Sequence, residues 1–435
     1  MFQSRARRSH LCAEIHPSLD GSEVHLLGWL HERRDLGGLR FLIFRDRSGK
    51  VQLIMNRRDT PEEVWRITDG LKRESVLSVT GTVKRSPQAP GGAEVLVSKV
   101  ELLASSDDLP LDVVGKTEAE LDTRLDYRVL DLRRAAPQAI FRIESTTVRA
   151  IRSFLYDRGF MEVFTPKIIS TATEGGANLF SVFYYDRLAY LSQSPQLYKE
   201  VLTSDFERVY EIAPAFRAEE SDTLRHLAEV TMVDAEAAFF DYEDVMDLMT
   251  GLIKAVVQEV NSENEEDLKV LGRSRLEEVD SIPRLEYDEA VKLLDEAGVP
   301  HEHEGDLGTP ELKEISKHYP GYYFIVNWPT KARPFYVQPL KDNPSRSESF
   351  DLMYGWLELS SGATRVSDGD LLRKRLMEQG LNPESFKKHL MWFRYGMPPH
   401  AGFGLGLARL VMALTGVSNV REAVLFPRDR RRLEP

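Results

Sequence analysis

The residues of this chain best suited to chemistry lie in the charged stretch from Phe216 to Glu236, FRAEESDTLRHLAEVTMVDAE. The stretch has the pattern of two strands joined by a charged loop. Arg217 and Arg225 could hold a polyphosphate, because a guanidinium is always charged and forks onto phosphate oxygens. Glu219 points the same way as Arg217 along a strand and could accept from an adenine amino group. An isolated Arg-x-Glu is more often a solvated hairpin tip, so the interpretation depends on the rest of the chain.

A second candidate site lies in the stretch SFDLMYGWLELSSGATR, residues 349–365, which we predict to be one strand followed by a turn at 360–362. Its carboxylates Asp351 and Glu358 and the hydroxyl of Ser361 suit Mg²⁺, which takes few protein oxygens and shares the rest with phosphates and water. In a regular strand the two carboxylates face opposite sides, and only a bulge between them would bring both to one metal. We therefore favour Glu358 and Ser361 as ligands, with Asp351 as a further candidate.

Near the carboxyl end, alternating glycines in GFGLGLARL, residues 402–410, precede a helical pattern. No register of this stretch fits the dinucleotide-binding G-x-G-x-x-G/A. Such glycines suit a strand that something packs flat against, and Arg409 would begin the following helix near its positive end, with a phosphate in reach. Gln196 and Lys199 are three residues apart on one face of a helix opened by Pro195. Glu174 precedes paired glycines and would move with their loop.

The length and composition limit what must position these residues. A chain of 435 residues suggests two or three domains, and no apolar run approaches the roughly 18 residues of a membrane span. The single cysteine, Cys12, rules out an intrachain disulfide and fits a reducing compartment, so we expect a cytoplasmic protein. Residues 1–104 carry a net charge of +4 and the remainder −16, which permits a polyanion site on the first domain.

Residues 1–104 have the pattern of a five-stranded barrel of the OB-fold, with three strands, a helix at 61–68 and two more strands. Such barrels bind single-stranded nucleic acid on an open face. Aromatic side chains could stack on bases and arginines could follow the phosphates; these are Trp29, Phe41 and Phe44, with Arg33, Arg34, Arg40 and Arg45. The alternative is that the aromatic residues are barrel core.

We predict a linker or hinge over residues 105–126 and a second, larger domain over 127–435, with an insertion at about 261–345. Pro137 to Arg158 is predicted as a long amphipathic helix that ends at Gly159. A strand stopped by Pro166 follows it. A helix and strand of this kind are an ordinary core element and also a common subunit interface.

Together these motifs resemble class II aminoacyl-tRNA synthetases of the aspartyl, asparaginyl and lysyl subgroup over essentially the whole chain. The helix ending in GFMEVFTP resembles motif 1, FRAEE with RHLAE resembles motif 2, and GFGLGLARL resembles motif 3. The resemblance implies an α+β protein: an amino-terminal OB-fold anticodon-binding domain and an antiparallel catalytic sheet flanked by helices. It also implies a homodimer.

The resemblance implies roles for individual residues in using ATP and Mg²⁺. Arg217 and Arg409 are expected to be catalytic, Arg217 at the α-phosphate and Arg409 at the γ-phosphate, and Glu219 is expected to hold the adenine amino group. Glu358 and Ser361 are expected to hold Mg²⁺. The expected ATP-binding residues are Arg217, Glu219, Arg225, His226, Leu227, Glu358, Gly406 and Arg409. Motif 3 usually has an acidic residue before its arginine; here it is Ala408, which puts the orientation of Arg409 in doubt.

Within the subgroup, the chain resembles aspartyl enzymes of the archaeal type. SQSPQLYKE places Lys199 where those enzymes bind the substrate side-chain carboxylate, with Arg365 as its partner. A lysine and arginine facing a neutral amide would leave buried charge unpaired, so charge can separate aspartate from asparagine. The expected aspartate-binding residues are Glu174, Gln196, Lys199, Arg217, Ser361 and Arg365. The expected reaction is aspartyl-adenylate formation followed by transfer to tRNA.

A finer resemblance concerns tRNA choice. Archaeal-type enzymes that also charge tRNA-Asn carry a histidine and a proline at two anticodon-domain positions, and this chain has His31 and Pro87. We hypothesise a non-discriminating enzyme that charges tRNA-Asp and tRNA-Asn and passes the second product to a tRNA-dependent amidotransferase. The alternative is that His31 is a strand surface residue and Pro87 an ordinary turn former. A strict aspartyl enzyme, an asparaginyl enzyme and a synthetase-like protein that makes a free amino acid or only binds RNA are the competing interpretations.

Overall fold

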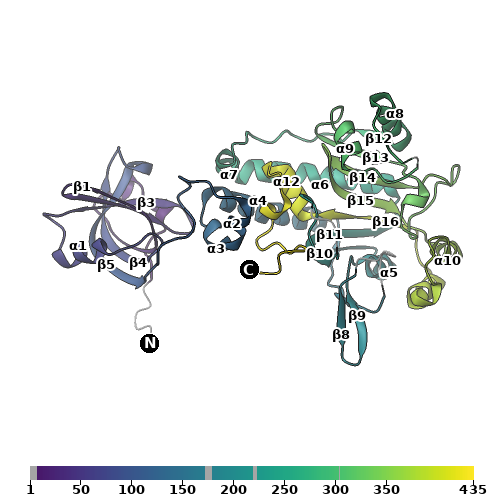
Figure 1. Ribbon diagram of the computed structural model, residues 1–435, viewed down its shortest axis with the longest axis horizontal. Helices are drawn as coiled ribbons and strands as arrows, with labels where there is room; N and C mark the ends of the chain where they lie inside the picture. The colour runs from purple at the N-terminus through teal and green to yellow at the C-terminus, as the bar shows by residue number, and fades with distance from the viewer. Residues whose placement is uncertain (1–6, 172–178, 219–222, 303) are drawn as a thin grey trace. The chain divides into compact units, whose positions relative to one another are not determined.

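The computed structural model describes residues 7–171, 179–218, 223–302 and 304–435. The chain divides into two compact units between Arg134 and Ala135. The first contains the barrel and the second contains the large sheet (Figure 1). No helix in the described ranges is long and apolar enough to cross a membrane.

The first unit is built on a closed five-stranded barrel, in the strand order β1-β2-β3-β5-β4. Alternate residues of each strand point inward and form its core, including the completely buried Leu42, Leu53 and Val79. The predicted OB-fold barrel is confirmed. Its elements are β1 (Glu23–Leu36), β2 (Leu39–Arg45), β3 (Lys50–Asn56), α1 (Glu62–Asp69), β4 (Val76–Arg85) and β5 (Ala93–Ala104).

The segment predicted as a linker belongs to this first unit. Leu111 and Val113 are buried, and the carboxylate of Asp112 accepts from the backbone N–H groups of Lys116 and Thr117, which closes a turn. Two short helices follow, α2 (Leu121–Asp126) and α3 (Arg128–Asp131). The compact unit ends at Arg134, so it includes the predicted first domain, which ended at residue 104, and the predicted linker of residues 105–126.

The second unit is organised around an eight-stranded sheet in the order β12-β13-β14-β15-β16-β11-β10-β6. Neighbouring strands are antiparallel except at the two ends, where β12 pairs with β13 and β10 with β6 in parallel. The strands are β6 (Met161–Glu162), β10 (Arg208–Phe216), β11 (Glu229–Ala238), β12 (Arg284–Glu286), β13 (Tyr322–Val326), β14 (Ser349–Tyr354), β15 (Leu357–Thr364) and β16 (His400–Gly406). A separate small sheet contains β7 (Ile168–Ile169), β9 (Arg187–Leu191) and β8 (Ser181–Tyr184).

Helices α4, α6 and α12 lie along the large sheet and close its main apolar core (Figure 1). Ile143 of α4, Met249 of α6 and Leu410 of α12 are completely buried there. The predicted helix at 137–158 is α4 (Ala135–Tyr156). The other helices are α5 (Gln196–Phe206), α6 (Tyr242–Glu263), α7 (Glu265–Val270), α8 (Tyr287–Ala297), α9 (Thr309–Ile315), α10 (Gly369–Glu378), α11 (Lys387–Trp392) and α12 (Leu407–Thr415).

Two predictions about the second unit are wrong. Residues 349–365 form a hairpin of β14 and β15, and the turn lies at Gly355 and Trp356, where Gly355 has a positive φ of 54°. The turn predicted at 360–362 lies inside β15. Residues 261–345, the predicted insertion, include β12 and the apolar β13, which extend the main sheet at its edge.

Candidate active site

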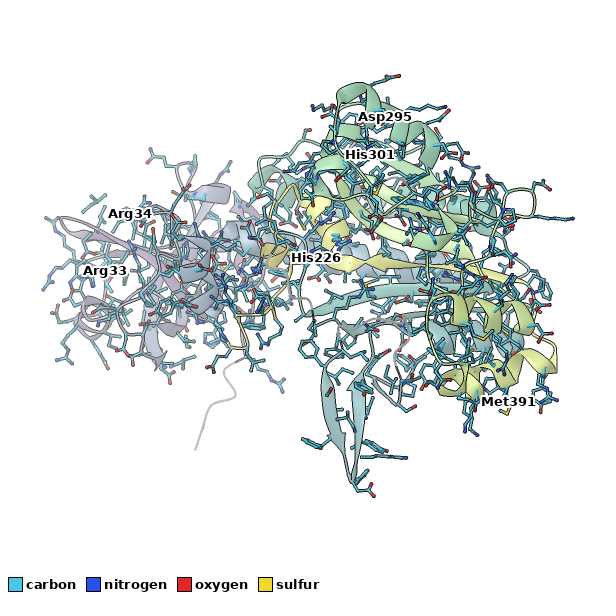
Figure 2. All side chains as sticks on the ribbon, turned by 45° about the vertical axis from the view of Figure 1, so that its right-hand side comes forward. Arg33, Arg34, His226, Asp295, His301 and Met391 are labelled. Carbon is cyan, nitrogen blue, oxygen red and sulfur yellow. The ribbon has the colours of Figure 1, made fainter. Side chains whose placement is uncertain are left out.

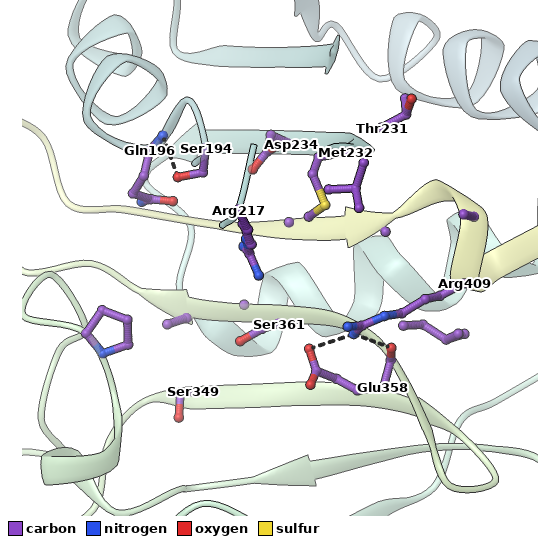
Figure 3. A pocket seen from close by; sticks show the side chains of 18 of the residues that line it. Ser194, Gln196, Arg217, Thr231, Met232, Asp234, Ser349, Glu358, Ser361 and Arg409 are labelled. Atoms are coloured by element: carbon purple, nitrogen blue, oxygen red, sulfur yellow. Dashed lines mark hydrogen bonds and ion pairs between the residues drawn. The ribbon is translucent and has the colours of Figure 1, made fainter. Parts of the chain in front are cut away.

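A cavity of about 230 Å³ opens over the middle of the large sheet. Its walls come from α5, the end of β10, and strands β11, β15 and β16. Figure 3 shows Arg217 pointing into it between Asp234 on one side and Ser361 on the other. The cavity brings together eleven of the predicted site residues: Gln196, Lys199, Arg217, Arg225, His226, Leu227, Glu358, Ser361, Arg365, Gly406 and Arg409.

Five other predicted residues are not part of this cavity wall. Glu174 and Glu219 lie outside the described residues. Asp351 lies behind the wall and is only 4% exposed. His31 and Pro87 belong to the first unit. Most of the predicted site residues therefore line one cavity, and their roles stay predictions.

One end of the cavity contains two buried cations bridged by carboxylates. The Lys199 ammonium lies 3.0 Å from Asp234 Oδ1 and 3.4 Å from Glu236 Oε2, and it donates to the Phe403 carbonyl at 2.8 Å. The Arg365 guanidinium donates from Nε to Glu236 Oε1 at 2.8 Å. Glu236 therefore joins the lysine and arginine that we expect to face a substrate carboxylate.

The alternating glycines of β16 make room for these carboxylates. Gly402 is directly opposite Glu236 on β11, and Gly404 is opposite Asp234. A Cβ added at Gly402 would lie 2.2 Å from the Ala235 carbonyl oxygen and from Glu236 Oε2. The predicted close packing against the glycines is present, and what packs there is the pair of acidic side chains of the neighbouring strand.

The other end of the cavity is rich in arginine. Arg409 donates from Nη1 to the Glu358 carbonyl at 3.0 Å, and the same nitrogen lies 3.5 Å from Glu358 Oε1 (Figure 3). Burial acts to raise the pKa of Glu358, but the charges of Arg409, Arg333, Arg217 and Arg225 outweigh it and hold the pKa below its ordinary value. A half-buried carboxylate among several guanidinium groups is a site that a polyphosphate and a divalent cation can share.

Asp351 lies next to Glu358 because the two come from paired strands rather than one. The register of β14 and β15 shifts between Leu352 and Met353, which marks a β-bulge in the hairpin. This is the kind of irregularity that we expected between the two carboxylates. Asp351 Oδ2 pairs with Arg333 at 2.7 Å, whereas its buried Oδ1 has no hydrogen-bond partner among the described residues. Burial, partly offset by Arg333, raises the pKa of Asp351 to about 6. An orphaned carboxylate oxygen beside Glu358 and Ser361 fits an oxygen-ligated cation such as Mg²⁺.

Sequence reasoning missed Asp234, Arg333 and Tyr336, which line the cavity, and Glu236, which pairs with Lys199 and Arg365 of its wall. The acidic pair could have been found from its spacing, since two carboxylates two residues apart in an apolar strand point the same way and need cations. Arg333 and Tyr336 fell inside the predicted insertion, and no local pattern marks them.

Three of the residues predicted to bind nucleic acid on the barrel are buried in the structure, so this part of the prediction is wrong. Phe44 is completely buried in the barrel core, so it cannot stack on a base. Arg40 and Arg45 are also buried: Arg40 donates to the Trp65 carbonyl and to Thr68, and Arg45 pairs with Glu74 at 2.7 Å. Their charges therefore serve the barrel itself and are not available to phosphates.

Four of the seven predicted residues still border the outside of the barrel. Trp29 and Phe41 are half-buried, at positions that alternate with core residues. Arg33 is partly occupied by an ion pair with Asp35 at 2.5 Å. Arg34 has 62% of its side chain exposed, and Figure 2 shows both arginines on the barrel. The two half-buried aromatic residues and the exposed Arg34, which also pairs with Glu32 at 2.9 Å, are the remaining candidates for stacking and phosphate contact.

His31 is buried, with 3% of its surface exposed, so it is not the strand surface residue of the alternative interpretation. It is the extra residue of a bulge in β1, where the pairing with β2 shifts between Leu30 and Glu32. Its Nε2 lies 2.9 Å from the Lys50 ammonium and its Nδ1 3.5 Å from Glu74 Oε1. Pro87, by contrast, is exposed in the loop after β4.

The two units match known families separately. Residues 24–103 match the OB-fold nucleic acid binding domain, and residues 120–430 match the tRNA synthetases class II (D, K and N). The second match covers well over half of the chain. This protein belongs to the class II tRNA synthetases of the D, K and N group. The predicted family is confirmed, and the protein is an aminoacyl-tRNA synthetase, an enzyme class that uses ATP.

Curated relatives of this synthetase cover its whole length. The aspartate–tRNA(Asp/Asn) ligase of Methanothermobacter thermautotrophicus is 50% identical, over 100% of both chains. The protein of the same name from Methanopyrus kandleri is 50% identical over 97% of this chain and 98% of its own. The aspartate–tRNA(Asp) ligase of Pyrobaculum aerophilum is 46% identical over 99% of both.

Solved structures share the fold of this synthetase. Asparaginyl-tRNA synthetase from Pyrococcus horikoshii, complexed with asparaginyl-adenylate, superimposes with a TM-score of 0.93 at 35% identity, over 98% of this chain and 99% of that one. A putative aspartyl-tRNA synthetase from Leishmania major gives a TM-score of 0.90 at 30% identity, over 100% and 97%. The fold is therefore common to enzymes named for either amino acid, and side chains in the cavity must separate them.

Proposed function

We propose that this synthetase activates L-aspartate with ATP and transfers it to tRNA-Asp and also to tRNA-Asn. The observation that carries the amino-acid choice is the pair of buried cations, Lys199 and Arg365, at one end of the cavity. A substrate side-chain carboxylate can accept from both. The amide of asparagine would turn N–H donors toward cations and leave buried charge uncompensated, which can separate two isosteric ligands by about 10⁴-fold.

The side chains around these cations, among them the carboxylate of Asp234, could bind the α-amino group of the amino acid. Asp234 lines the cavity beside Lys199, where it can receive the α-ammonium group of the amino acid. Gln196 lines the same wall and donates to Glu200 from its side-chain amide, which leaves its amide oxygen to accept from the amino acid. Cations for the side chain and anions for the amino group would fix both ends of an aspartate.

The arginine-rich end would hold ATP. In the reaction, a carboxylate oxygen of aspartate forms a bond to the α-phosphorus, the bond to the β-phosphate oxygen breaks, and pyrophosphate leaves. A ribose hydroxyl of the tRNA then attacks the acyl carbon and AMP leaves. Arg217 lies between the two ends of the cavity and would stabilise the charge that develops at the α-phosphate, and Arg409 would hold the γ-phosphate. The residues assigned to ATP are Arg217, Glu219, Arg225, His226, Leu227, Glu358, Gly406 and Arg409.

Glu358 and Ser361, with Asp351 beside them, would hold Mg²⁺, which would neutralise phosphate charge when bound. No side-chain nucleophile is required. The chain's contribution is to orient the carboxylate and the triphosphate and to exclude water from the reacting atoms.

The relaxed choice of tRNA is supported by a line of contacts on the barrel. His31 contacts Lys50, and Gln52, two residues along the same face of β3, donates to Glu94 at 2.8 Å. Glu94 follows the loop that contains Pro87. His31 would act from beneath the barrel surface through Lys50, and Pro87 would act from its exposed loop.

We further propose a cytoplasmic homodimer. Large apolar side chains at the end of α4 and just beyond it are exposed: Tyr156 by 75%, Met161 by 49% and Phe164 by 81%. An apolar group of this kind suits an obligate interface between two copies. The aspartyl-tRNA-Asn product would be handed to a tRNA-dependent amidotransferase.

Charging with labelled aspartate on two transcripts tests this function. One transcript carries a GUC anticodon and the other a GUU anticodon, and labelled asparagine serves as the control amino acid. Comparable charging of both with aspartate, and none with asparagine, is the expected result. Charging of the GUC transcript alone would leave a strict aspartyl enzyme, and charging with asparagine would overturn the assignment of Lys199 and Arg365.

A further inference from the structure

A buried ionic cluster lies directly behind the amino-acid end of the cavity. It consists of Glu200 on α5, His389 on α11 and His400 at the start of β16. Glu200 and His400 are completely buried and His389 is 7% exposed. These three residues come from distant parts of the sequence, and none of them lines the cavity.

Glu200 connects this cluster to the cavity wall. Its Oε1 accepts a hydrogen bond from Gln196 Nε2 at 2.5 Å. Its Oε2 faces the two imidazoles, 3.3 Å from His389 Nε2 and 3.9 Å from His400 Nε2. These three facing atoms have no hydrogen-bond partner of ideal geometry among the described residues, so their mutual charge is what holds them.

The backbone around His400 determines which of its nitrogens carries a proton. His400 Nδ1 lies 2.9 Å from the carbonyl oxygen of Pro398. A carbonyl can only accept, so Nδ1 must donate and carry its hydrogen. Nε2 then has a hydrogen to offer Glu200 only when the ring is an imidazolium. A neutral His400 would instead turn a lone pair toward a carboxylate in a completely buried site.

The charges of the neighbouring side chains also favour the imidazolium form in this cluster. Three carboxylates, Asp234, Glu236 and Glu200, lie around two cationic side chains, Lys199 and Arg365. The backbone N–H of Arg365 donates to the carbonyl of His400 at 2.9 Å, so the cluster and the aspartate end of the cavity are in direct contact. One imidazolium brings the numbers of buried positive and negative groups into balance.

Two observations support an ionised Glu200 held by ion pairing. Burial opposes ionisation, but contacts with His389 and His400 hold the pKa of Glu200 well below its ordinary range. In addition, no group of three His, Cys, Asp or Glu side chains in the described part of the chain has the geometry to hold a metal ion. Ion pairing therefore accounts for the cluster better than coordination.

We propose that Glu200 is a positioning residue for aspartate binding: it fixes Gln196 in the cavity wall, and an imidazolium shared by His389 and His400 balances its charge. This inference rests on the proposed function of the cavity. If it holds, the affinity for aspartate depends on a proton held by the two histidines. The phosphoryl chemistry at Arg217 and Arg409 does not depend on that proton.

A pH-dependent affinity follows. When the imidazolium loses its proton, Glu200 becomes an uncompensated negative charge next to the site of the substrate carboxylate. The KM for aspartate should rise on the order of tenfold, as one nearby unit charge in a partly buried site implies. The kcat and the KM for ATP should change little, because the arginine-rich end of the cavity is untouched.

The test is aspartate-dependent exchange of pyrophosphate into ATP, measured from about pH 6 to about pH 9, which spans the ordinary titration range of imidazole. Glu200→Gln keeps an acceptor oxygen for Gln196 but carries no charge, so its histidines have no anion to balance. We expect a KM for aspartate that is nearly independent of pH and a kcat close to that of the wild type. Glu200→Ala also removes the acceptor and should raise the KM at every pH.

Glu211→Gln is the matched control. Glu211 is equally buried, on β10, but it binds Thr165 and Lys167 rather than a cavity residue. This variant loses a buried carboxylate and should keep the wild-type pH profile. A wild-type profile in Glu200→Gln would overturn the inference, whereas failure of the wild type to activate aspartate would instead overturn the proposed function.

A spectroscopic measurement keeps the inference testable if Glu200→Gln does not fold. Nuclear magnetic resonance of wild-type protein labelled in its 10 histidine rings reports the protonation state of each ring, with His389→Gln and His400→Gln used to assign the signals. The expected result is one ring of this pair with a hydrogen on both of its nitrogens. Two neutral rings at pH 7 would overturn the inference.

Discussion

At the scale of single residues, Arg217 is the group on which the proposed chemistry depends most. It lies between the cation pair at one end of the cavity and the arginines at the other (Figure 3). We expect Arg217→Ala to lower the rate of adenylate formation by about 10²–10³-fold, by analogy with removal of one oxyanion donor. Pyrophosphate exchange measures this rate, and Arg275→Ala, an exposed arginine of the same unit, is the control.

A near-normal rate in the Arg217 variant would remove this residue from the mechanism. The test is selective because Arg275 has 72% of its side chain exposed and pairs with the neighbouring Glu278, outside the cavity. A general loss of positive charge would affect both variants, while a loss of transition-state stabilisation would affect Arg217 alone.

Glu144 on α4 offers a prediction about stability and pH. Burial alone raises the pKa of Glu144 to about 7, from an ordinary value of 4.5. The folded state therefore favours the protonated acid, and its stabilising effect is complete below pH 4.5 and lost as the pH rises through about 7. Glu144→Gln stays neutral, so it should melt a few degrees higher than the wild type at pH 8.

At pH 4.5 or below, the wild type and Glu144→Gln should melt at the same temperature. Thermal denaturation followed by circular dichroism measures both values. Glu296→Gln, at an exposed position of α8, should change neither. A Glu144→Gln protein that gains stability equally at both pH values would show that charge is not the cause.

The residues that sequence alone identified are those with a distinctive local motif. Arg217, Arg409 and Lys199 each lie in a short pattern of fixed spacing, and the structure brings them into one cavity. Glu200 was written in the same stretch as Lys199, but its role depends on His389 and His400, which are nearly 200 residues away. A contact between residues so distant in sequence cannot be read from one chain without its fold.

At the scale of elements, the glycine-containing strand β16 leaves no space for a side chain at Gly402. Gly402→Ala would place a methyl group against Glu236 and the β11 backbone, and a strand with both faces packed cannot move aside. We expect a loss of stability of about 1–3 kcal/mol and a raised KM for aspartate, because Glu236 positions both Lys199 and Arg365.

Denaturant unfolding and pyrophosphate exchange measure these two effects. Gly321→Ala is the matched control, since an added Cβ there meets nothing within 4 Å. The control should be neutral in both measurements. An unchanged KM in Gly402→Ala would mean that the amino-acid end tolerates displacement of Glu236.

The sequence predicted helices and strands correctly where apolar residues recur at a regular spacing. It failed where an apolar run continues through a turn. The barrel strands alternate regularly and were predicted, and α4 has a clear apolar stripe. The hairpin of β14 and β15 was predicted as one strand, because an apolar run continues through Gly355 and Trp356 without the usual polar turn residues. The positive φ of Gly355 is visible only in the structure.

At the scale of the whole molecule, the first compact unit should fold alone. It has its own buried core and closed barrel, and its boundary lies at Arg134. Burial, assisted by Asp46, raises the pKa of the Cys12 thiol to about 12, so this thiol is neutral at pH 8. In a fragment of residues 1–134, we expect Cys12 to resist thiol reagents at pH 8 and to react only in denaturant.

Because Cys12 is the single cysteine, the full chain gives the same readout without ambiguity. Equal protection in the fragment and the full chain would show independent folding. Rapid labelling of the fragment alone would mean that the first unit needs residues beyond 134. The predicted first domain ended at residue 104 and left this segment out, because the polar composition of the segment concealed the buried Leu111 and Val113.

The order of strands in the catalytic sheet has a consequence for how this protein is made. β16 is the last strand in the chain, yet it lies between β11 and β15, near the middle of the sheet. Until His400 to Gly406 has left the ribosome, the sheet is two halves with open edges, a state prone to wrong pairing. Contacts so distant in sequence also slow folding. The barrel can be finished early in synthesis, whereas the catalytic sheet and its cavity can close only after β16 has emerged.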